Sequence, residues 1–218
     1  MRKKVKKNLV ISLSLLAAFA LWTIALIFID VQAIGPGSSS VGLATINAAF
    51  HSLTGVHMVL YTITDWLGLI PVAFGFGFTV LGLVQWCKRK SLFKVDFSIL
   101  MLGVFYIAVL AAYLFFESHV VNYRPVLING YLEASYPSST TLLVMCVMPT
   151  ARMQLTTRTH KHTAKRIVSL LIIFFTGFMV LGRLLSGVHW LTDIIGGALL
   201  SAGLVILYQA ICNIKTDL

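Results

Sequence analysis

The sequence has few charged residues and little that could build a soluble or cross-linked fold. Only 11% of its 218 residues are charged, against about 25% in an ordinary soluble domain, so a water-soluble globule is excluded. The three cysteines lie far apart without a CxxC pair, which argues against a disulfide scaffold or a cysteine metal site. With 58% hydrophobic residues and a mean hydropathy of +0.91, the chain is predicted to be an integral membrane protein.

Acidic residues are also scarce, with 7 Asp and Glu against 17 Lys and Arg. In a soluble protein this balance would suggest nucleic acid, but here the basic residues alternate between segments that connect apolar stretches. Five lie before residue 9, none in 30–65, four in 87–96, one in 117–138 and five in 152–166. By the positive-inside rule, both termini and the two basic loops are expected in the cytoplasm. No nucleic-acid partner is expected.

The fold class expected is all-α, with six transmembrane helices in one bundle forming a single membrane-embedded domain over residues 1–218. The six apolar stretches are Leu9–Ile29, Trp66–Trp86, Phe97–Phe116, Ser139–Ala151, Ile167–Gly182 and Trp190–Cys212. The first is too long for the apolar core of a signal peptide and is read as an uncleaved anchor. The fourth and fifth are short for a membrane of about 30 Å, so their outer ends are expected to be recessed unless extra turns extend them.

The segment Val41–His57 is too polar to span a membrane. Its apolar residues at 43, 46, 50 and 53 recur at helical spacing. We therefore expect an amphipathic helix lying in the outer interface.

Polar residues gather at the expected outer ends of the spans, where Arg124 and Arg183 are the only basic side chains. His189 and Asp193 are four residues apart and so share one helix face. A carboxylate that fixes one imidazole nitrogen leaves the other free to attack, and an arginine can clamp a phosphate beside it. The alternative is an interfacial histidine capped by a nearby carboxylate, with Arg183 reaching toward water.

A second polar group is Pro137 followed by Ser138, Ser139 and Thr140. Proline before hydroxyl residues is typical of a helix start, where free N–H groups and the helix dipole favour an anion. Ordinary capping of the fourth span explains the same residues and stays open.

These residues together resemble the three motifs of the type 2 phosphatidic acid phosphatase superfamily, KxxxxxxRP, PSGH and SRxxxxxHxxxD. The resemblance covers residues 117–193, and the Arg183, His189 and Asp193 spacing is met in full. It implies a metal-independent phosphatase without cofactor, with His189 as nucleophile and Asp193 orienting it. Phosphate would be held by Arg124, Arg183, Ser138 and Ser139.

The sequence departs from this pattern at several positions. Glu117 stands where the family has lysine, Ser139 where it has glycine, and Thr140 where it has the histidine expected to be the general acid; Gly182 replaces serine. A phosphate leaving group, with a second pKa of about 6, leaves far more easily than an alkoxide and needs no acid. A lipid diphosphate, such as a polyprenyl diphosphate, is therefore the preferred substrate. Alternatively, His119, His57 or Glu133 could supply the acid.

The function expected is an outward-facing membrane phosphatase that acts on a lipid phosphate or diphosphate through a phosphohistidine. The alternative is a weakened family member that binds or transports phosphate-bearing lipids, as the changes at Glu117 and Thr140 suggest. Membrane lipids and the substrate are the expected partners, the location is a plasma membrane of bacterial type, and the sequence does not indicate an oligomeric state.

Overall fold

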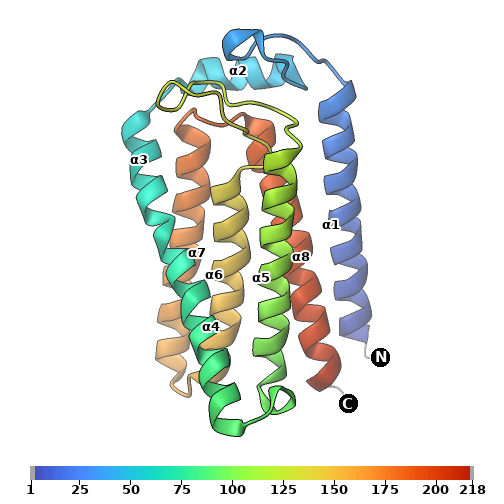
Figure 1. Ribbon diagram of the computed structural model, residues 1–218, viewed down its shortest axis with the longest axis vertical. Coiled ribbons are helices and arrows are strands. Elements are labelled where there is room, and N and C mark those ends of the chain that lie inside the picture. Colours follow the sequence, from blue (N-terminus) through green and yellow to red (C-terminus); the bar gives the residue numbers. More distant parts are fainter. Residues whose placement is uncertain (1–2, 217–218) are drawn as a thin grey trace.

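The computed structural model describes residues 3–216, with side chains through Ile214, and its regular elements are all helical. No β-strand occurs within those residues. The elements are α1 (Lys3–Phe28), η1 (Pro36–Ser38), α2 (Ala44–Thr54), α3 (Met58–Leu67), α4 (Leu69–Arg89), η2 (Leu92–Lys94), α5 (Phe97–Ser118), α6 (Ser139–Arg158), α7 (His162–Leu185) and α8 (Leu191–Thr216). The long helices run side by side, and both termini lie at the same end (Figure 1).

Five segments of the described chain are long and apolar enough to cross a membrane: α1, α3 with α4, α5, α7 and α8. The pair α3–α4 forms one apolar segment because the Gly68 N–H donates to the Thr64 carbonyl at 3.1 Å, which continues the helical hydrogen bonding. This segment begins at Met58, eight residues before the expected Trp66. The described chain is thus all-helical, and five of its segments have the length and composition of membrane spans.

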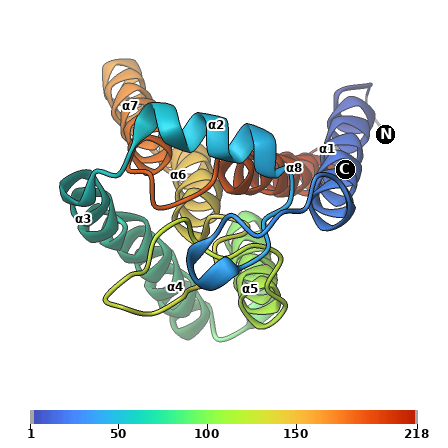
Figure 2. The same ribbon diagram turned by 90° about the horizontal axis from the view of Figure 1, so that it is seen from above.

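The helix α6 is not among those five, although a span was expected at Ser139–Ala151. It contacts α4, α5, α7 and α8 and is surrounded by them when the bundle is viewed from its end (Figure 2). Buried polar residues on it are satisfied inside the protein. Thr150 donates to the Cys146 carbonyl at 2.8 Å, and Gln154 donates to the Tyr208 hydroxyl at 2.5 Å. A helix enclosed by other helices can be less apolar than one that faces lipid.

Extra turns extend the fourth and fifth helices beyond their short apolar stretches, because α6 has 20 residues and α7 has 24. The helices continue into the basic segment that was expected to be a loop, leaving only 159–161 as a turn. Arg158 stabilises this extension by donating to Asp96 at 3.2 Å and to the Gln154 carbonyl at 3.2 Å. The Ser139 end of α6 nevertheless begins deeper than the neighbouring ends of α5, α7 and α8 (Figure 1).

The short helix α2 lies crosswise over the end of the bundle opposite the termini (Figures 1 and 2). Asn47 fixes it there, because its buried amide donates to the Thr192 hydroxyl and to the Gly42 carbonyl, both at 2.9 Å. Of the apolar residues expected to share one face, Ile46 and Leu53 are exposed. A polar side chain therefore anchors α2 to the start of α8.

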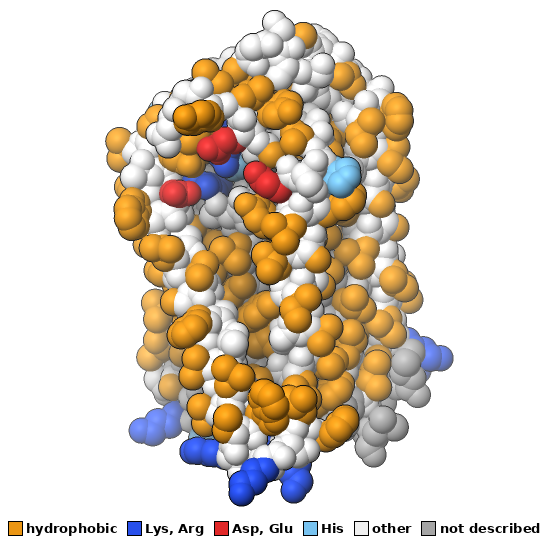
Figure 3. All heavy atoms as spheres, in the orientation of Figure 1, with side chains coloured by type: hydrophobic (Ala, Val, Ile, Leu, Met, Phe, Trp, Pro, Cys, Tyr) orange, Lys and Arg blue, Asp and Glu red, His pale blue; other side chains and the backbone are white. Residues whose placement is uncertain are grey.

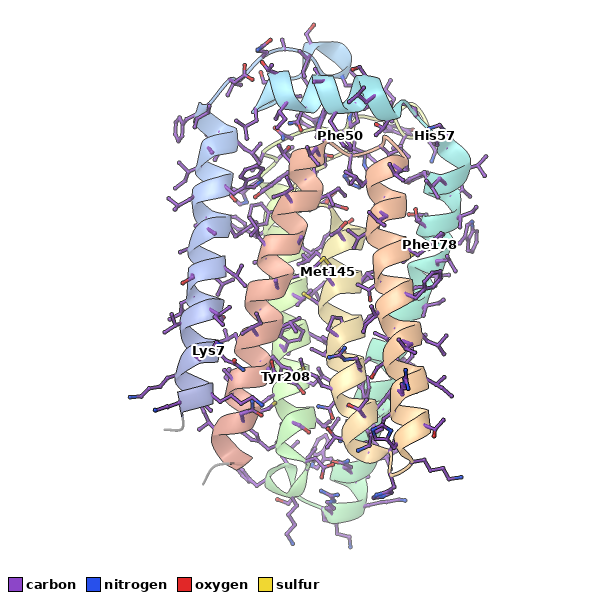
Figure 4. The ribbon with its side chains drawn as sticks, turned by 180° about the vertical axis from the view of Figure 1, so that it is seen from behind. Lys7, Phe50, His57, Met145, Phe178 and Tyr208 are labelled. Carbon is purple, nitrogen blue, oxygen red and sulfur yellow. The ribbon has the colours of Figure 1, made fainter. Side chains whose placement is uncertain are left out.

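The two ends of the bundle differ in charge. Lysine and arginine side chains gather at the end with the termini, while acidic side chains surround a basic group in a hollow near the α2 end (Figure 3). Lys7 marks the first end and His57, where α2 turns into α3, marks the other (Figure 4). Arg2 and the side chain of Lys215, two of the residues in the charge pattern, lie outside the described part of the chain.

Candidate active site

A polar cavity of about 250 Å³ lies near the α2 end and brings several of the predicted site residues together. Its lining residues come from α5, from the segment between α5 and α6, from the first turn of α6 and from the turn before α8. They are Tyr113, Phe116, Glu117, Arg124, Glu133, Ala134, Ser135, Tyr136, Pro137, Ser139, Leu142 and His189. Residues far apart in sequence thus meet in one pocket.

The turn between α7 and α8 places His189 in this pocket, and its shape depends on Gly187. Gly187 has a φ of +68°, and a Cβ atom there would lie 1.8 Å from the Gly55 carbonyl oxygen. The turn is also tied to the start of α3, because the His57 N–H donates to the Ser186 carbonyl at 2.9 Å. The α2–α3 connection therefore supports the His189 turn directly.

Ser135 lies between His189 and Asp193, so their side chains are linked through a hydroxyl. The Ser135 Oγ is 3.0 Å from His189 Nδ1 and donates a short hydrogen bond to Asp193 Oδ2, whereas Nδ1 and Oδ2 are 3.7 Å apart. Since the hydroxyl proton goes to the carboxylate, Oγ must accept the Nδ1 proton of a neutral imidazole. This arrangement leaves the Nε2 lone pair facing the pocket.

Burial also keeps His189 neutral. The residue is 2% exposed, and this desolvation lowers the pKa of His189 to about 4, with the nearby Arg124 acting in the same direction. Asp193 opposes the shift but does not overcome it. At pH 7 the imidazole is therefore in the form that can attack phosphorus.

Arg124 faces the Nε2 atom of His189, with its Nη1 atom 3.4 Å away. Its Nε atom lies 3.1 Å from Glu133, whose backbone carbonyl also accepts from the Arg124 N–H at 3.0 Å. The guanidinium is therefore held beside the point where a phosphate oxygen would sit next to Nε2. An arginine in this place is suited to a phosphate.

The three hydroxyl residues after Pro137 have different positions. Ser139 lines the polar cavity. Ser138 is fully buried as the N-cap of α6: its Oγ accepts from the Thr141 N–H at 3.4 Å, and its own N–H donates to the Asp193 carbonyl at 3.2 Å. Thr140 lines the neighbouring apolar cavity instead. Ser138 therefore caps α6, which is the alternative to phosphate binding that the sequence left open.

Arg183 is not among the described residues that line the polar cavity; it is 2% exposed and turned toward α3. Its Nη2 donates to Asp65 at 3.1 Å, and its guanidinium carbon lies 4.7 Å from the centre of the Tyr61 ring. Gly182 permits this packing, because a Cβ atom there would lie 2.6 Å from Thr64 Cγ2. Gly182, which stands where the family pattern has serine, therefore allows α3 and α7 to approach closely.

Of the three residues considered as acids, Glu133 lines the polar cavity, as does Glu117, which stands at the position of the family's lysine. His57 is exposed, with its Nε2 atom 2.9 Å from the Thr54 carbonyl. His119 is exposed and stacks on Phe115 with ring centres 4.6 Å apart. Neither of these two histidines is among the cavity's described lining residues.

Sequence reasoning missed Ser135 and Asp65. Ser135 stands two residues before Pro137, and only its position beside a predicted helix start could have drawn notice. Asp65 lies on an apolar helix with no motif around it, yet it forms the ion pair with Arg183. Asp65 stands at the end of the segment 30–65 that was expected to connect two spans, directly before Trp66, and the apolar residues around it were the signal that the helix begins earlier.

A second, apolar cavity of about 610 Å³ adjoins the polar one. It lies between α4, α5 and α6, and it shares Tyr113 and Ser139 with the polar cavity. Its other lining residues are largely apolar, with Asp65, Thr79 and Thr140 as exceptions. A polar pocket next to an apolar groove suits a ligand with a charged head and a hydrocarbon tail.

We expect Ser135→Ala to lower kcat by about 10- to 100-fold with little change in KM, as for a residue that orients a reactive one. The same substitution in an Asp193→Ala background should cost much less, because the link is then already broken. Phosphate-release kinetics of the two single variants and the double variant measure this coupling. Ser201→Ala, a buried serine of α8 that donates to the Gly197 carbonyl, is the matched control. Additive effects of the two substitutions would contradict the link.

Both the sequence and the fold of this chain are similar to those of known proteins. The sequence model described as the PAP2 superfamily matches residues 106–216, which include the polar cavity's helices and the His189 turn. No curated protein matches the sequence. Among solved structures, the fold is similar to the crystal structure of a transmembrane PAP2 type phosphatidylglycerolphosphate phosphatase from Bacillus subtilis. The TM-score is 0.56 at 18% identity, over 94% of this chain and 96% of that one.

Proposed function

The chain belongs to the PAP2 superfamily, and from this membership we propose that it is a membrane phosphatase that hydrolyses a lipid phosphate or diphosphate with His189 as nucleophile. The observation that carries the proposal is the polar cavity containing His189 and Arg124, which shares Tyr113 and Ser139 with an apolar cavity. The first cavity would hold the phosphate and the second the hydrocarbon chain.

In the proposed reaction, Nε2 of His189 attacks phosphorus and forms a phosphohistidine, which water then hydrolyses. The Nδ1–H···Ser135···Asp193 link keeps the attacking lone pair directed into the cavity. Arg124 and Ser139 would hold the phosphoryl oxygens. Arg183, which pairs with Asp65 of α3, would contribute its positive charge from outside the polar cavity. No metal is proposed for this chemistry. Asp193 stabilises the positive charge that the ring acquires when phosphorylated.

The lipid diphosphate remains the preferred substrate class. Thr140 stands where the family's acid would be and lies outside the polar cavity, so a leaving group that departs without a proton is favoured. A phosphatidylglycerophosphate, the substrate class in the name of the structural neighbour, is the monoester to compare with it. An alkoxide leaving group is much more basic.

We further propose that the enzyme is a single six-span domain of a bacterial plasma membrane, with α6 as the sixth span. At about 1.5 Å per residue, α6 is roughly 30 Å long, which matches the hydrocarbon core. The basic end with both termini would face the cytoplasm and the polar cavity would face outward. The α2 helix, with Ile46 and Leu53 exposed, would lie in the outer interface.

Phosphate release by the purified protein tests the function. We expect release from polyprenyl diphosphate, and more slowly from phosphatidic acid and phosphatidylglycerophosphate, in detergent with EDTA present. Loss of activity with EDTA that returns with a divalent metal would contradict the metal-free chemistry. A folded protein that binds these lipids but releases no phosphate from any of them would favour the binding or transport function.

A further inference from the structure

The polar cavity holds a titratable side chain that the proposed reaction has not yet used. Five other ionisable side chains line it besides His189: Tyr113, Glu117, Arg124, Glu133 and Tyr136. A general acid and base must be able to give up and take back a proton, must not be engaged by another group, and must reach the leaving oxygen from the cavity wall. Each of the five can be judged by these requirements.

Four of the five fail one of these requirements. Arg124 stays charged and gives up no proton. Glu133 is already engaged in an ion pair with Arg124 at 3.1 Å. Tyr136 is buried and shares a hydrogen bond of 2.7 Å with Thr23, away from His189. Tyrosine is also a weak acid at neutral pH, which counts against Tyr113.

Glu117 meets these requirements. It lies in the last turn of α5, is exposed at the mouth of the cavity, and forms no ion pair within 4.0 Å among the described residues. Its carboxyl group therefore lies in the same cavity as His189 without a cationic partner that engages it, and it is free to exchange a proton with a bound group.

We propose that Glu117 is the general acid and base of this enzyme. It would take the role of the family's histidine, whose position is occupied here by Thr140, a residue that cannot donate a proton at neutral pH. The inference rests on the proposed function. In the first step the Nε2 lone pair bonds to phosphorus, the bond from phosphorus to the bridging oxygen breaks, and the Glu117 proton passes to that oxygen. In the second step water bonds to phosphorus, gives one proton to the Glu117 carboxylate, and the P–N electron pair returns to His189.

The proposal explains why a glutamate at position 117 can serve the reaction where the family has a lysine. A lysine there would add attraction for phosphate, whereas a glutamate weakens that attraction but supplies a proton. The proton matters most for an alkyl ester, whose alkoxide leaves poorly, and little for a diphosphate. Glu117 would therefore extend the enzyme's range from diphosphates to monoesters.

Two lipids with the same tails test this: phosphatidic acid, an ester, and diacylglycerol diphosphate, an anhydride. We expect Glu117→Gln to lower the initial rate on the ester by about 10²-fold or more, and the rate on the diphosphate by less than about 10-fold. Glu117→Lys should show the same split, and Glu117→Asp should restore part of the ester rate. Glu133→Gln and Tyr113→Phe, the other cavity residues, should lower both rates by similar factors.

Equal losses on both lipids with Glu117→Gln would overturn the proposal, as would wild-type protein that cleaves only the diphosphate. A split that appears with Tyr113→Phe instead would assign the proton to that residue. Wild-type protein that releases phosphate from neither lipid would remove the proposed function itself, which separates the two failures.

Discussion

Phosphate release should fall by at least about 10⁴-fold when His189 is replaced by alanine, because no other nucleophile of similar strength lines the polar cavity. Catalysis that remains would come from Arg124 and the bound lipid's orientation alone. The residue is buried on a turn rather than within a helix, so the shortened side chain should leave the bundle folded. Initial rates on a lipid diphosphate, with an acid-labile phosphoenzyme measured after rapid quenching, check both parts.

The matched control is His119→Ala, which removes an exposed histidine outside the cavity. We expect it to keep wild-type activity and to form the phosphoenzyme. If His189→Ala retained more than a tenth of the wild-type rate, or still became phosphorylated, the nucleophile would be a different group.

Asp193→Asn is expected to lower kcat by about 10³- to 10⁴-fold, by analogy with the carboxylate of serine-protease triads. Asp193 Oδ2 accepts from Ser135 and, at 2.8 Å, from the Trp190 N–H, so an amide can keep part of this geometry. It cannot supply the negative charge that stabilises a phosphorylated, cationic imidazole. The loss should therefore appear in kcat, while lipid binding measured by its dissociation constant stays within a few-fold.

The control for this charge is Asp30→Asn. Asp30 also accepts a backbone hydrogen bond, from the Thr45 N–H at 2.7 Å, but it is exposed and outside the cavity. We expect Asp30→Asn to leave the rate unchanged. An Asp193→Asn protein as active as the Asp30→Asn protein would show that the charge of Asp193 does not assist the reaction.

The sequence predicted the class of fold because hydropathy and motif spacing are local properties. Membrane helices, the His189 and Asp193 spacing and the family could all be read from it. The extension of α6 to Arg158 could not, because it depends on partners such as Asp96 from a distant segment. The low hydropathy of α6 likewise goes with its enclosure by α4, α5, α7 and α8. A hydropathy average over neighbouring residues cannot show which other helices will surround a segment.

The candidate site was predicted only in its residue types. Arg183 was expected to reach the phosphate, yet its contact with Asp65 depends on how α7 meets α3. Ser138 was expected to bind phosphate but caps α6, because the Asp193 carbonyl and Thr141 occupy its polar atoms. Ser135 became visible only when His189 and Asp193 were placed on either side of it.

The anchoring of α2 has a kinetic consequence. With Asn47 fixing α2 across the end of the bundle, and the apolar cavity lying between α4, α5 and α6, a lipid would reach His189 by moving within the plane of the bilayer. Such an enzyme responds to the mole fraction of lipid at the surface rather than to its bulk concentration. Adding inert detergent at constant total lipid should therefore slow turnover by surface dilution, even while every protein molecule stays in a micelle.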